Sequence, residues 1–215
     1  MGLIDDICNK IKEYEELNPR PRTITIHTGR GGYELLKKAM NPEYTLDMPE
    51  YPDNNISIHH TAVIGPNVEI GEGTYIGPYC IIGYPAEHKE YWNEPCGKVV
   101  IGKNCVITGH VTIDAGTTRP THIMDNCWLL KHSHVGHDAL IGPNSTISCG
   151  AKVGGHAGTG HNVNIGLNAC IHQWIFVPEG CMVGMNSTIT KKTPLQPFRK
   201  YAGSPARDIG PNQPK

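Results

Sequence analysis

Three histidines lie within six positions, at His132, His134 and His137, and Asp138 follows the last of them. Imidazole side chains bind metal ions, and because their pKa lies near neutrality they also act as general acids and bases. A carboxylate next to an imidazole can fix its tautomer and stabilise its protonated form. The geometry of the surrounding chain decides which of these roles the residues can take.

The surrounding chain repeats every six residues, with a polar exception at Thr159. Aliphatic residues, often followed by glycine, occupy Ile58, Ile64, Ile70, Ile76, Ile82, Ile101, Ile107, Ile113, Ile123, Leu129, Val135, Ile141, Ile147, Val153, Ile165, Ile171, Val177, Val183 and Ile189. A period of six fits neither a helix nor a hairpin sheet. It is typical of a parallel β-helix in which three hexads close one coil, so that residues about 18 apart stack.

Two segments interrupt the period, YPAEHKEYWNEPCGKVV from residue 84 and GTTRPT from residue 116. We expect both to leave the coil as surface loops that contact substrate. The predicted fold class is all-β, a parallel β-helix with a small α/β N-terminal extension. Residues 1–50 are predicted to form a helix–strand–helix cap or oligomerisation module, residues 51–193 the β-helix, and residues 194–215 a C-terminal tail.

Composition excludes several classes of protein. A net charge of −1 over 215 residues, without a Lys/Arg tract, argues against nucleic-acid binding. No apolar run is long enough to span a membrane. The eight cysteines form no CxxC pair, which suits reduced thiols. We therefore expect a cytoplasmic protein with no membrane span and no nucleic-acid partner.

Stacking of the coils is expected to gather polar residues at one corner of the β-helix. The corner contains His134, His137, Asp138, Gly155, His156, His172 and Gln173. Gly155 leaves space beside His137 that a substrate could occupy, because glycine has no side chain. Other turn histidines, such as His110 and His132, are expected to be solvated polar groups.

The segments HVGHD, VGGH and IHQW resemble, in this order and spacing, the H-x-x-H-D, G-H and H-Q-F elements of the UDP-N-acetylglucosamine O-acyltransferases of lipid A synthesis. The resemblance covers about residues 56–193 and implies a left-handed helix. It implies that His137 is the general base, Asp138 its partner and the Gly155 N–H an oxyanion donor. It further implies that the substrate is bound by His134, His156, His172 and Gln173.

The implied chemistry is acyl transfer from a thioester to a hydroxyl of a nucleotide-activated amino sugar. A base of near-neutral pKa and a backbone donor, worth about 3 kcal/mol, suffice for this step. The resemblance also implies a homotrimer with the site between subunits. We expect no metal and no bound cofactor, with acyl carrier protein or coenzyme A delivering the acyl chain.

The sequence departs from the family at several positions. Asp114, in TIDAGT, replaces a histidine and resembles the sister N-acyltransferases. His88, or else Glu87, falls where the family has a sugar-binding aspartate. Met185 takes a position that limits acyl length in the family, and Met182 lies near it, so a short-to-medium chain is expected. The alternative for Met185 is that it fills the core.

The C-terminal segment also differs from the family. YAGSPARDIG resembles the closing segment of hexapeptide acetyltransferases, and the family's C-terminal helical domain is not present in this sequence. In those acetyltransferases the basic residue of this segment lies near coenzyme A. We therefore expect Arg199 and Arg207 to contact coenzyme A phosphates or the acidic surface of acyl carrier protein.

Three alternatives stay open at this point. The first is an amino-sugar N-acyltransferase, to which Asp114 points. The second is a metalloenzyme resembling the gamma-class carbonic anhydrases, since His132 and His137 have the five-residue spacing of two of their zinc ligands. The third is a non-catalytic β-helix that serves in assembly, with the N-terminal module as its docking element.

Overall fold

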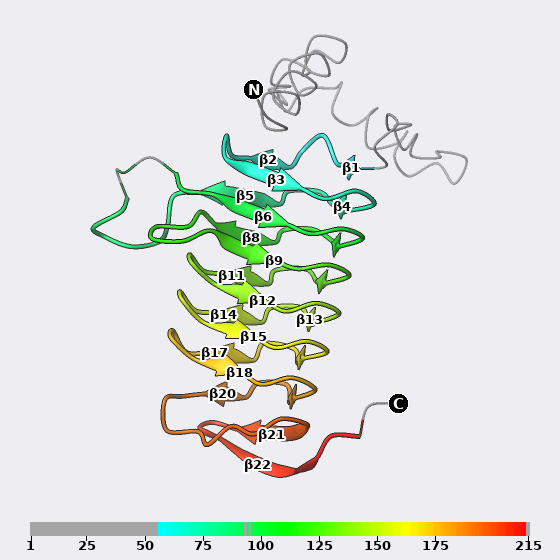
Figure 1. Ribbon diagram of the computed structural model, residues 1–215, viewed down its shortest axis with the longest axis vertical. Coiled ribbons are helices and arrows are strands. Elements are labelled where there is room, and N and C mark those ends of the chain that lie inside the picture. Colours follow the sequence, from blue (N-terminus) through cyan, green and yellow to red (C-terminus); the bar gives the residue numbers. More distant parts are fainter. Residues whose placement is uncertain (1–55, 93, 95, 214–215) are drawn as a thin grey trace, which may run out of the picture. The chain divides into compact units, whose positions relative to one another are not determined.

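The computed structural model describes residues 56–92, 94 and 96–213, which form a left-handed parallel β-helix (Figure 1). The predicted module of residues 1–50 lies outside the described residues. Each coil contributes one short strand to each of three sheets. Where the chain has no insertion, strands of successive coils pair in register at the expected interval, as Trp128 pairs with Thr146 and Thr146 with Asn164. The predicted fold of this region is confirmed.

The three sheets run along the β-helix. The first contains β1 (Ser57–Ile58), β4 (Tyr75–Ile76), β7 (Val106–Ile107), β10 (Trp128–Leu129), β13 (Thr146–Ile147), β16 (Asn164–Ile165), β19 (Met182–Val183), β21 (Arg199–Gly203) and β22 (Ala206–Pro211). The second contains β2 (Val63–Ile64), β5 (Ile81–Tyr84), β8 (Thr112–Asp114), β11 (His134–Val135), β14 (Lys152–Val153), β17 (Cys170–Ile171) and β20 (Thr188–Ile189). The third contains β3 (Val68–Ile70), β6 (Val99–Ile101), β9 (Thr121–Ile123), β12 (Leu140–Ile141), β15 (Gly158–Thr159) and β18 (Phe176–Val177).

The core follows the six-residue period. The aliphatic series is buried from Ile76 to Ile189, and burying such side chains is the main term that stabilises the coils. Thr159 is buried as well, and its hydroxyl accepts a hydrogen bond from the Gly142 N–H at 3.0 Å. A second inward position lies two residues before each aliphatic one. It takes small or medium-sized side chains: Cys80, Cys105, Val111, Cys127, Ser133, Ala139, Ser145, Ala151, Ala157, Val163, Ala169, Ile175, Cys181 and Ser187.

This second position explains half of the eight cysteines. Cys80, Cys105, Cys127 and Cys181 are buried there, where cysteine packs as a small apolar side chain. All the cysteines among the described residues are free. The four buried ones serve as packing residues in this fold.

Both interruptions of the period leave the β-helix at the same corner, between the second and third sheets. The first loop connects β5 to β6 and the second connects β8 to β9, and both project to the left in Figure 1. The next turn at this corner, between β11 and β12, carries His137 and Asp138. The insertions thus lie directly beside the predicted site.

The C-terminal segment continues the fold. β21 pairs in parallel with β19 and in antiparallel with β22, so a hairpin ends the first sheet. Tyr201 of this hairpin is fully buried, and its hydroxyl accepts a hydrogen bond from the Gln196 N–H at 2.7 Å. Residues that the sequence describes only as a tail therefore cover one end of the core. Among the described residues, no helix has the length and apolarity needed to cross a membrane.

Candidate active site

The turns at each corner place one residue in the left-handed backbone conformation. At the corner between the third and first sheets this residue is asparagine in four coils: Asn104, Asn126, Asn144 and Asn162. Asparagine tolerates a positive φ better than most residues. At the site corner the same position is taken by Asp138 (φ 59°), His156 (φ 58°) and Trp174 (φ 65°). A bulky residue such as Trp174 is unusual in this conformation, and such outliers cluster at functional sites.

The second loop surrounds the carboxylate of Asp138. This carboxylate is fully buried and accepts hydrogen bonds from the backbone N–H groups of Thr118 (2.8 Å) and Arg119 (2.7 Å). It also accepts one from the Thr117 hydroxyl at 2.7 Å. The Asp138 N–H in turn donates to the Thr121 hydroxyl at 2.8 Å. The loop expected to contact substrate therefore holds the carboxylate, a role that the sequence analysis missed.

These contacts set the charge of Asp138 and the tautomer of His137. Burial acts to raise the pKa of Asp138, but hydrogen bonds from Thr117, His137, Arg119 and Thr118 outweigh it and hold the pKa well below its usual range. The ionised carboxylate lies 2.7 Å from Nδ1 of His137. Nδ1 of the neutral imidazole therefore carries the proton and donates it to Asp138, which leaves Nε2 free to act as a base.

Gly155 lies against this free nitrogen. A Cβ at position 155 would come within 2.6 Å of Nε2 of His137, so any side chain here would displace the imidazole. The Gly155 carbonyl accepts a hydrogen bond from the Trp174 N–H at 3.1 Å, whereas its own N–H donates to no group in the described part of the chain. The site thus offers an unused backbone donor next to an unused imidazole nitrogen.

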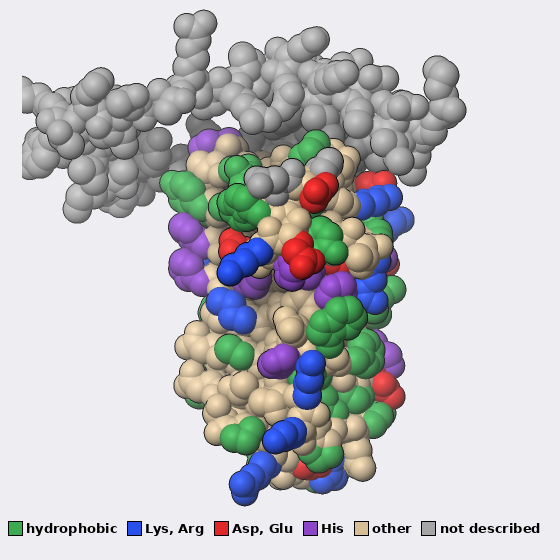
Figure 2. All heavy atoms as spheres, turned by 90° about the vertical axis from the view of Figure 1, so that its left-hand side faces the viewer, with side chains coloured by type: hydrophobic (Ala, Val, Ile, Leu, Met, Phe, Trp, Pro, Cys, Tyr) green, Lys and Arg blue, Asp and Glu red, His purple; other side chains and the backbone are tan. Residues whose placement is uncertain are grey.

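Aromatic side chains form the wall of the site. His156 stacks on Trp174 with ring centroids 3.8 Å apart, and meets His137 edge-on at 5.0 Å. The ring centroid of His88, in the first loop, lies 5.8 Å from that of His137. A cavity of about 220 Å³ is lined by His88, Glu90, Tyr91, His137, His156, Gln173 and Trp174. Figure 2 looks onto this corner and shows histidine side chains gathered below the loops.

His134 lies on β11, just before the turn that carries His137. As predicted, it pairs with Lys152 of the next coil. Its Nδ1 lies 2.8 Å from the Thr112 hydroxyl, and its Nε2 lies 3.8 Å from a carboxylate oxygen of Asp114. Burial and then the charge of Lys152 lower the pKa of His134, so this imidazole is neutral at neutral pH.

His172 lies at the same corner, next to Gln173, but does not line the cavity. It is exposed, and its Nδ1 lies 2.9 Å from the Gln173 carbonyl oxygen. Four further predicted site residues, Met182, Met185, Arg199 and Arg207, lie away from this arrangement. Met182 lies on the first sheet, and Met185 follows it at the corner between the first and second sheets. Met185 is 66% exposed, so the alternative that it fills the core is wrong.

The basic residues of the C-terminal hairpin differ from each other. Arg199 makes two hydrogen bonds to Asp208, of 2.6 and 2.9 Å, so its guanidinium is held within the hairpin. Arg207 is exposed. Of the two, Arg207 is the better placed to bind an anionic partner.

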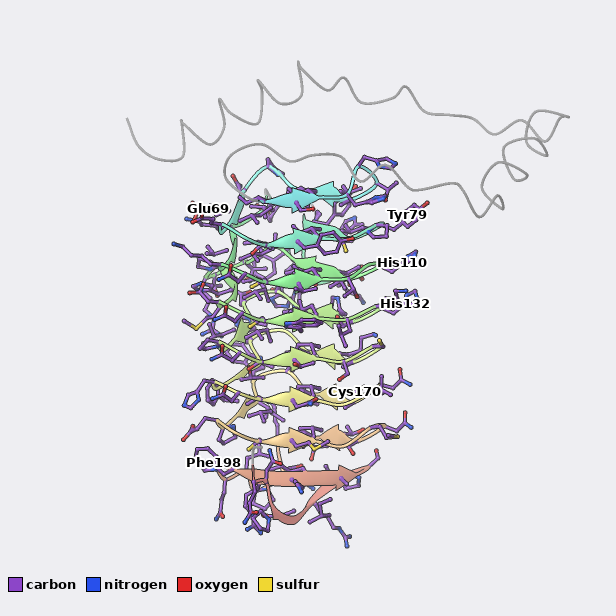
Figure 3. The ribbon with its side chains drawn as sticks, turned by 90° about the vertical axis from the view of Figure 1, so that its right-hand side faces the viewer. Glu69, Tyr79, His110, His132, Cys170 and Phe198 are labelled. Atoms are coloured by element: carbon purple, nitrogen blue, oxygen red, sulfur yellow. The ribbon has the colours of Figure 1, made fainter. Side chains whose placement is uncertain are left out.

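The structure separates the two histidines that a carbonic-anhydrase-like site requires. His132 lies at the corner between the first and second sheets, where it stacks on His110 at 4.9 Å. Figure 3 shows Tyr79, His110 and His132 along this edge. His137 lies at the next corner, so the two imidazoles do not converge within one chain. A single chain therefore does not form that metalloenzyme site.

A different set of metal-type donors does converge. His137, Asp138 and His156 each place one donor atom within 4.8 Å of the others. The oxygens of Asp138 are already hydrogen-bonded to the second loop and to His137. This cluster is thus built as a hydrogen-bonded acid–base array, and the absence of a bound metal stays a prediction.

Two family models match the chain. The "bacterial transferase hexapeptide (six repeats)" model matches residues 120–155, and the "hexapeptide repeat of succinyl-transferase" model matches residues 159–191. An acyl-[acyl-carrier-protein]–UDP-N-acetylglucosamine O-acyltransferase from Campylobacter concisus is 31% identical over 64% of this chain and 54% of its own length. The corresponding protein from Campylobacter lari is 36% identical over 71% of this chain and 59% of its own. The chain thus spans little more than half the length of these curated relatives.

Solved structures of UDP-N-acetylglucosamine acyltransferases also resemble this chain. A UDP-N-acetylglucosamine acyltransferase from Bacteroides fragilis superposes with a TM-score of 0.68 at 28% identity, over 74% of this chain and 62% of the other. The one from Campylobacter jejuni gives 0.59 at 30% identity, over 73% and 66%. By sequence and by fold, the chain is a hexapeptide-repeat β-helix that is similar to the UDP-N-acetylglucosamine O-acyltransferases.

Proposed function

We propose that this protein is an acyltransferase that moves an acyl chain from a thioester to a hydroxyl of UDP-N-acetylglucosamine. The observation that carries the proposal is the pairing of His137 with the buried, ionised Asp138, which leaves Nε2 free beside Gly155. The relatives named above act on this sugar nucleotide through an oxygen atom, which favours a hydroxyl over an amine as the acceptor.

The reaction needs one base and one oxyanion donor. Nε2 of His137 removes the proton from the sugar hydroxyl as its oxygen attacks the thioester carbonyl carbon. The resulting oxyanion accepts a hydrogen bond from the Gly155 N–H, a contact worth about 3 kcal/mol in comparable sites. When the intermediate collapses, the C–S bond breaks and the imidazolium returns its proton to the departing sulfur. Asp138 stabilises the imidazolium throughout, without becoming protonated.

The acyl donor is proposed to be acyl carrier protein, because the relatives' names specify it. Coenzyme A would present the same thioester, so the donor is an explicit arm of the test. No resident cofactor is needed, since the acyl group arrives on the donor. A cytoplasmic location suits both donors and stays a prediction.

A homotrimer would complete the site. His137 and Met185 lie at different corners of one β-helix, so a single chain does not bring them to one cleft. A neighbouring copy could place its Met185 edge against the His137 corner of the first. The short-to-medium acyl chain predicted from Met185 therefore depends on this assembly, whose stoichiometry light scattering can measure.

Acyl transfer by the purified full-length protein tests the proposal. UDP-N-acetylglucosamine would be combined with acyl chains from acetyl to myristoyl, on acyl carrier protein and on coenzyme A. We expect turnover with one range of chain lengths, lowered about 10²- to 10⁴-fold by His137→Ala. His161→Ala is the matched control, because His161 is an exposed turn histidine away from the site. No turnover with any donor, or equal turnover by His137→Ala, would exclude the proposed function.

A further inference from the structure

Two buried carboxylates at the corner between the second and third sheets have opposite surroundings. Asp138 accepts hydrogen bonds from three backbone N–H groups and two hydroxyls of the second loop, and from His137. The side chain of Asp114 is only 8% exposed. Apart from the backbone N–H of Glu87, which favours its ionised form, no donor among the described residues reaches it. A carboxylate can accept about four hydrogen bonds. Asp114 therefore retains unused acceptor capacity where water has little access.

The small number of hydrogen-bond donors around Asp114 makes its ionised form less stable. A buried polar group without partners destabilises the fold, and for a carboxylate the cost is carried by the ionised form. Burial raises the pKa of Asp114 to about 6, and the charge of Glu87 also raises it, while the Glu87 N–H and His137 lower it. The structure thus maintains an unfavourable carboxylate beside its proposed base, as sites that bind a ligand often do.

The space between Asp114 and His134 is bordered by a carboxylate oxygen and an imidazole nitrogen. Nε2 of His134 lies 3.8 Å from its carboxylate oxygen, which is too long for a direct hydrogen bond. Nδ1 of the same ring lies 2.8 Å from the Thr112 hydroxyl, so the ring is held with Nε2 towards Asp114. If Thr112 donates to Nδ1, then Nε2 carries the proton. A hydroxyl placed in this space could donate to Asp114 and accept from His134 at once.

We propose that Asp114 is an acceptor-binding residue whose carboxylate, together with Nε2 of His134, receives a sugar hydroxyl adjacent to the one that is acylated. The inference rests on the proposed function for the identity of the acceptor. It follows from the placement of Asp114 one coil before His137 at the same corner, and from its unused acceptor capacity. The bound hydroxyl would fix the sugar's orientation, so that the neighbouring hydroxyl meets Nε2 of His137.

Kinetics with modified acceptors test this role. We expect Asp114→Asn to raise KM for UDP-N-acetylglucosamine about tenfold, as for the loss of one charge-assisted hydrogen bond, and to leave KM for the donor unchanged. A series of UDP sugars, each lacking one hydroxyl, should contain one analogue with a similar KM increase in the wild type. That increase should disappear in Asp114→Asn, because the two changes remove the same contact. Asp125→Asn, an exposed aspartate on another corner, is the matched control.

The pH dependence provides a second readout. Because the carboxylate must be ionised to accept the hydroxyl, KM of the wild type should rise as the pH falls below about 6. Glu87, His134 and His137 are the titratable groups that act on Asp114, and they remain in Asp114→Asn. A KM increase at low pH that is equally large in Asp114→Asn would therefore belong to those groups and would overturn the inference, as would an unchanged KM in the variant.

Failure of the proposed function gives a distinguishable result. If the wild type transfers no acyl group, calorimetric binding of UDP-N-acetylglucosamine still decides the question. Binding weakened by Asp114→Asn supports the inference, and equal binding overturns it. If Asp114→Asn does not fold, the deoxygenated sugars decide with the wild type alone. A series in which no analogue binds or reacts more than about threefold worse would then overturn the role of Asp114.

Discussion

A carboxylate oxygen of Asp138 lies 2.7 Å from Nδ1 of His137, and the same carboxylate is held by the backbone of the Thr117–Arg119 turn. The adjacent residues of one hexad thus supply both members of a base–orienter pair. The loop from the preceding coil keeps the carboxylate ionised, which decides which nitrogen of His137 is free.

Replacing Asp138 with asparagine tests this arrangement. Asp138→Asn presents an amide to hydrogen-bond donors that need a carboxylate. We therefore expect turnover to fall at least a hundredfold. The free energy of unfolding should fall by about 3 kcal/mol at pH near 7. The pKa of Asp138 is lower in the folded protein than its value of about 4 in the unfolded chain. Asp138 therefore stabilises the fold at pH values above about 4, and this stabilisation is lost as the pH falls towards the pKa of the folded state. Denaturant unfolding at several pH values measures this. A stability difference that does not narrow below about pH 4 would contradict the assignment.

Gly155→Ala should inactivate the site without removing any polar group. The added Cβ would lie 2.6 Å from Nε2 of His137, so the imidazole must rotate out of place. We expect kcat to fall about a hundredfold or more, because small displacements of a base are costly. Gly184→Ala is the matched control, since its Cβ would approach no atom closer than 3.3 Å. Equal kcat in Gly155→Ala and the wild type would show that His137 is not the base.

Met185→Ala should lengthen the preferred acyl chain by a few carbons if Met185 limits the acyl pocket. The side chain is 66% exposed in a single chain, so its removal should change stability by less than about 0.5 kcal/mol. Turnover across a series of acyl donors measures the preference. Met124→Ala, another exposed methionine, should leave it unchanged. An unaltered chain-length profile in Met185→Ala would remove this residue from the acyl pocket.

Asp114→Asn should stabilise the protein at alkaline pH. The native pKa of Asp114 is raised to about 6, so its ionised form destabilises the fold above that pH, by up to about 3 kcal/mol, and the penalty fades as the pH falls towards the unfolded value. The asparagine carries no charge and avoids this penalty. Thermal unfolding should therefore show a higher Tm for the variant at about pH 8, with the gain shrinking near pH 4. A variant less stable than the wild type at pH 8 would contradict this sign.

Much of the fold could be predicted because, in a β-helix, residues separated by a fixed number of positions stack on each other. Three hexads close each coil, so the stacking of His134 on Lys152 follows from counting. The same counting places Gly155 against His137, and the structure agrees. The buried aliphatic series follows from the same period, since one residue in each hexad must face the axis.

The rest depends on segments that do not obey the period. The second loop does not follow the six-residue period, so its contacts with Asp138 could not be predicted by counting. Two consecutive threonines one coil before an aspartate are nevertheless a sequence signal for hydrogen bonds to that carboxylate. Pairing of Arg199 with Asp208 likewise depends on a hairpin register, which antiparallel strands set through their turn.

The sequence by itself determined the β-helix, the column of residues at one corner and the family that these residues resemble. Only the tertiary structure decided the tautomer of His137, the small number of donors around Asp114 and the separation of His132 from His137 within one chain. The physical reason is that a repeat specifies which residues stack, whereas pKa values depend on burial and on donors from segments that lie outside the repeat.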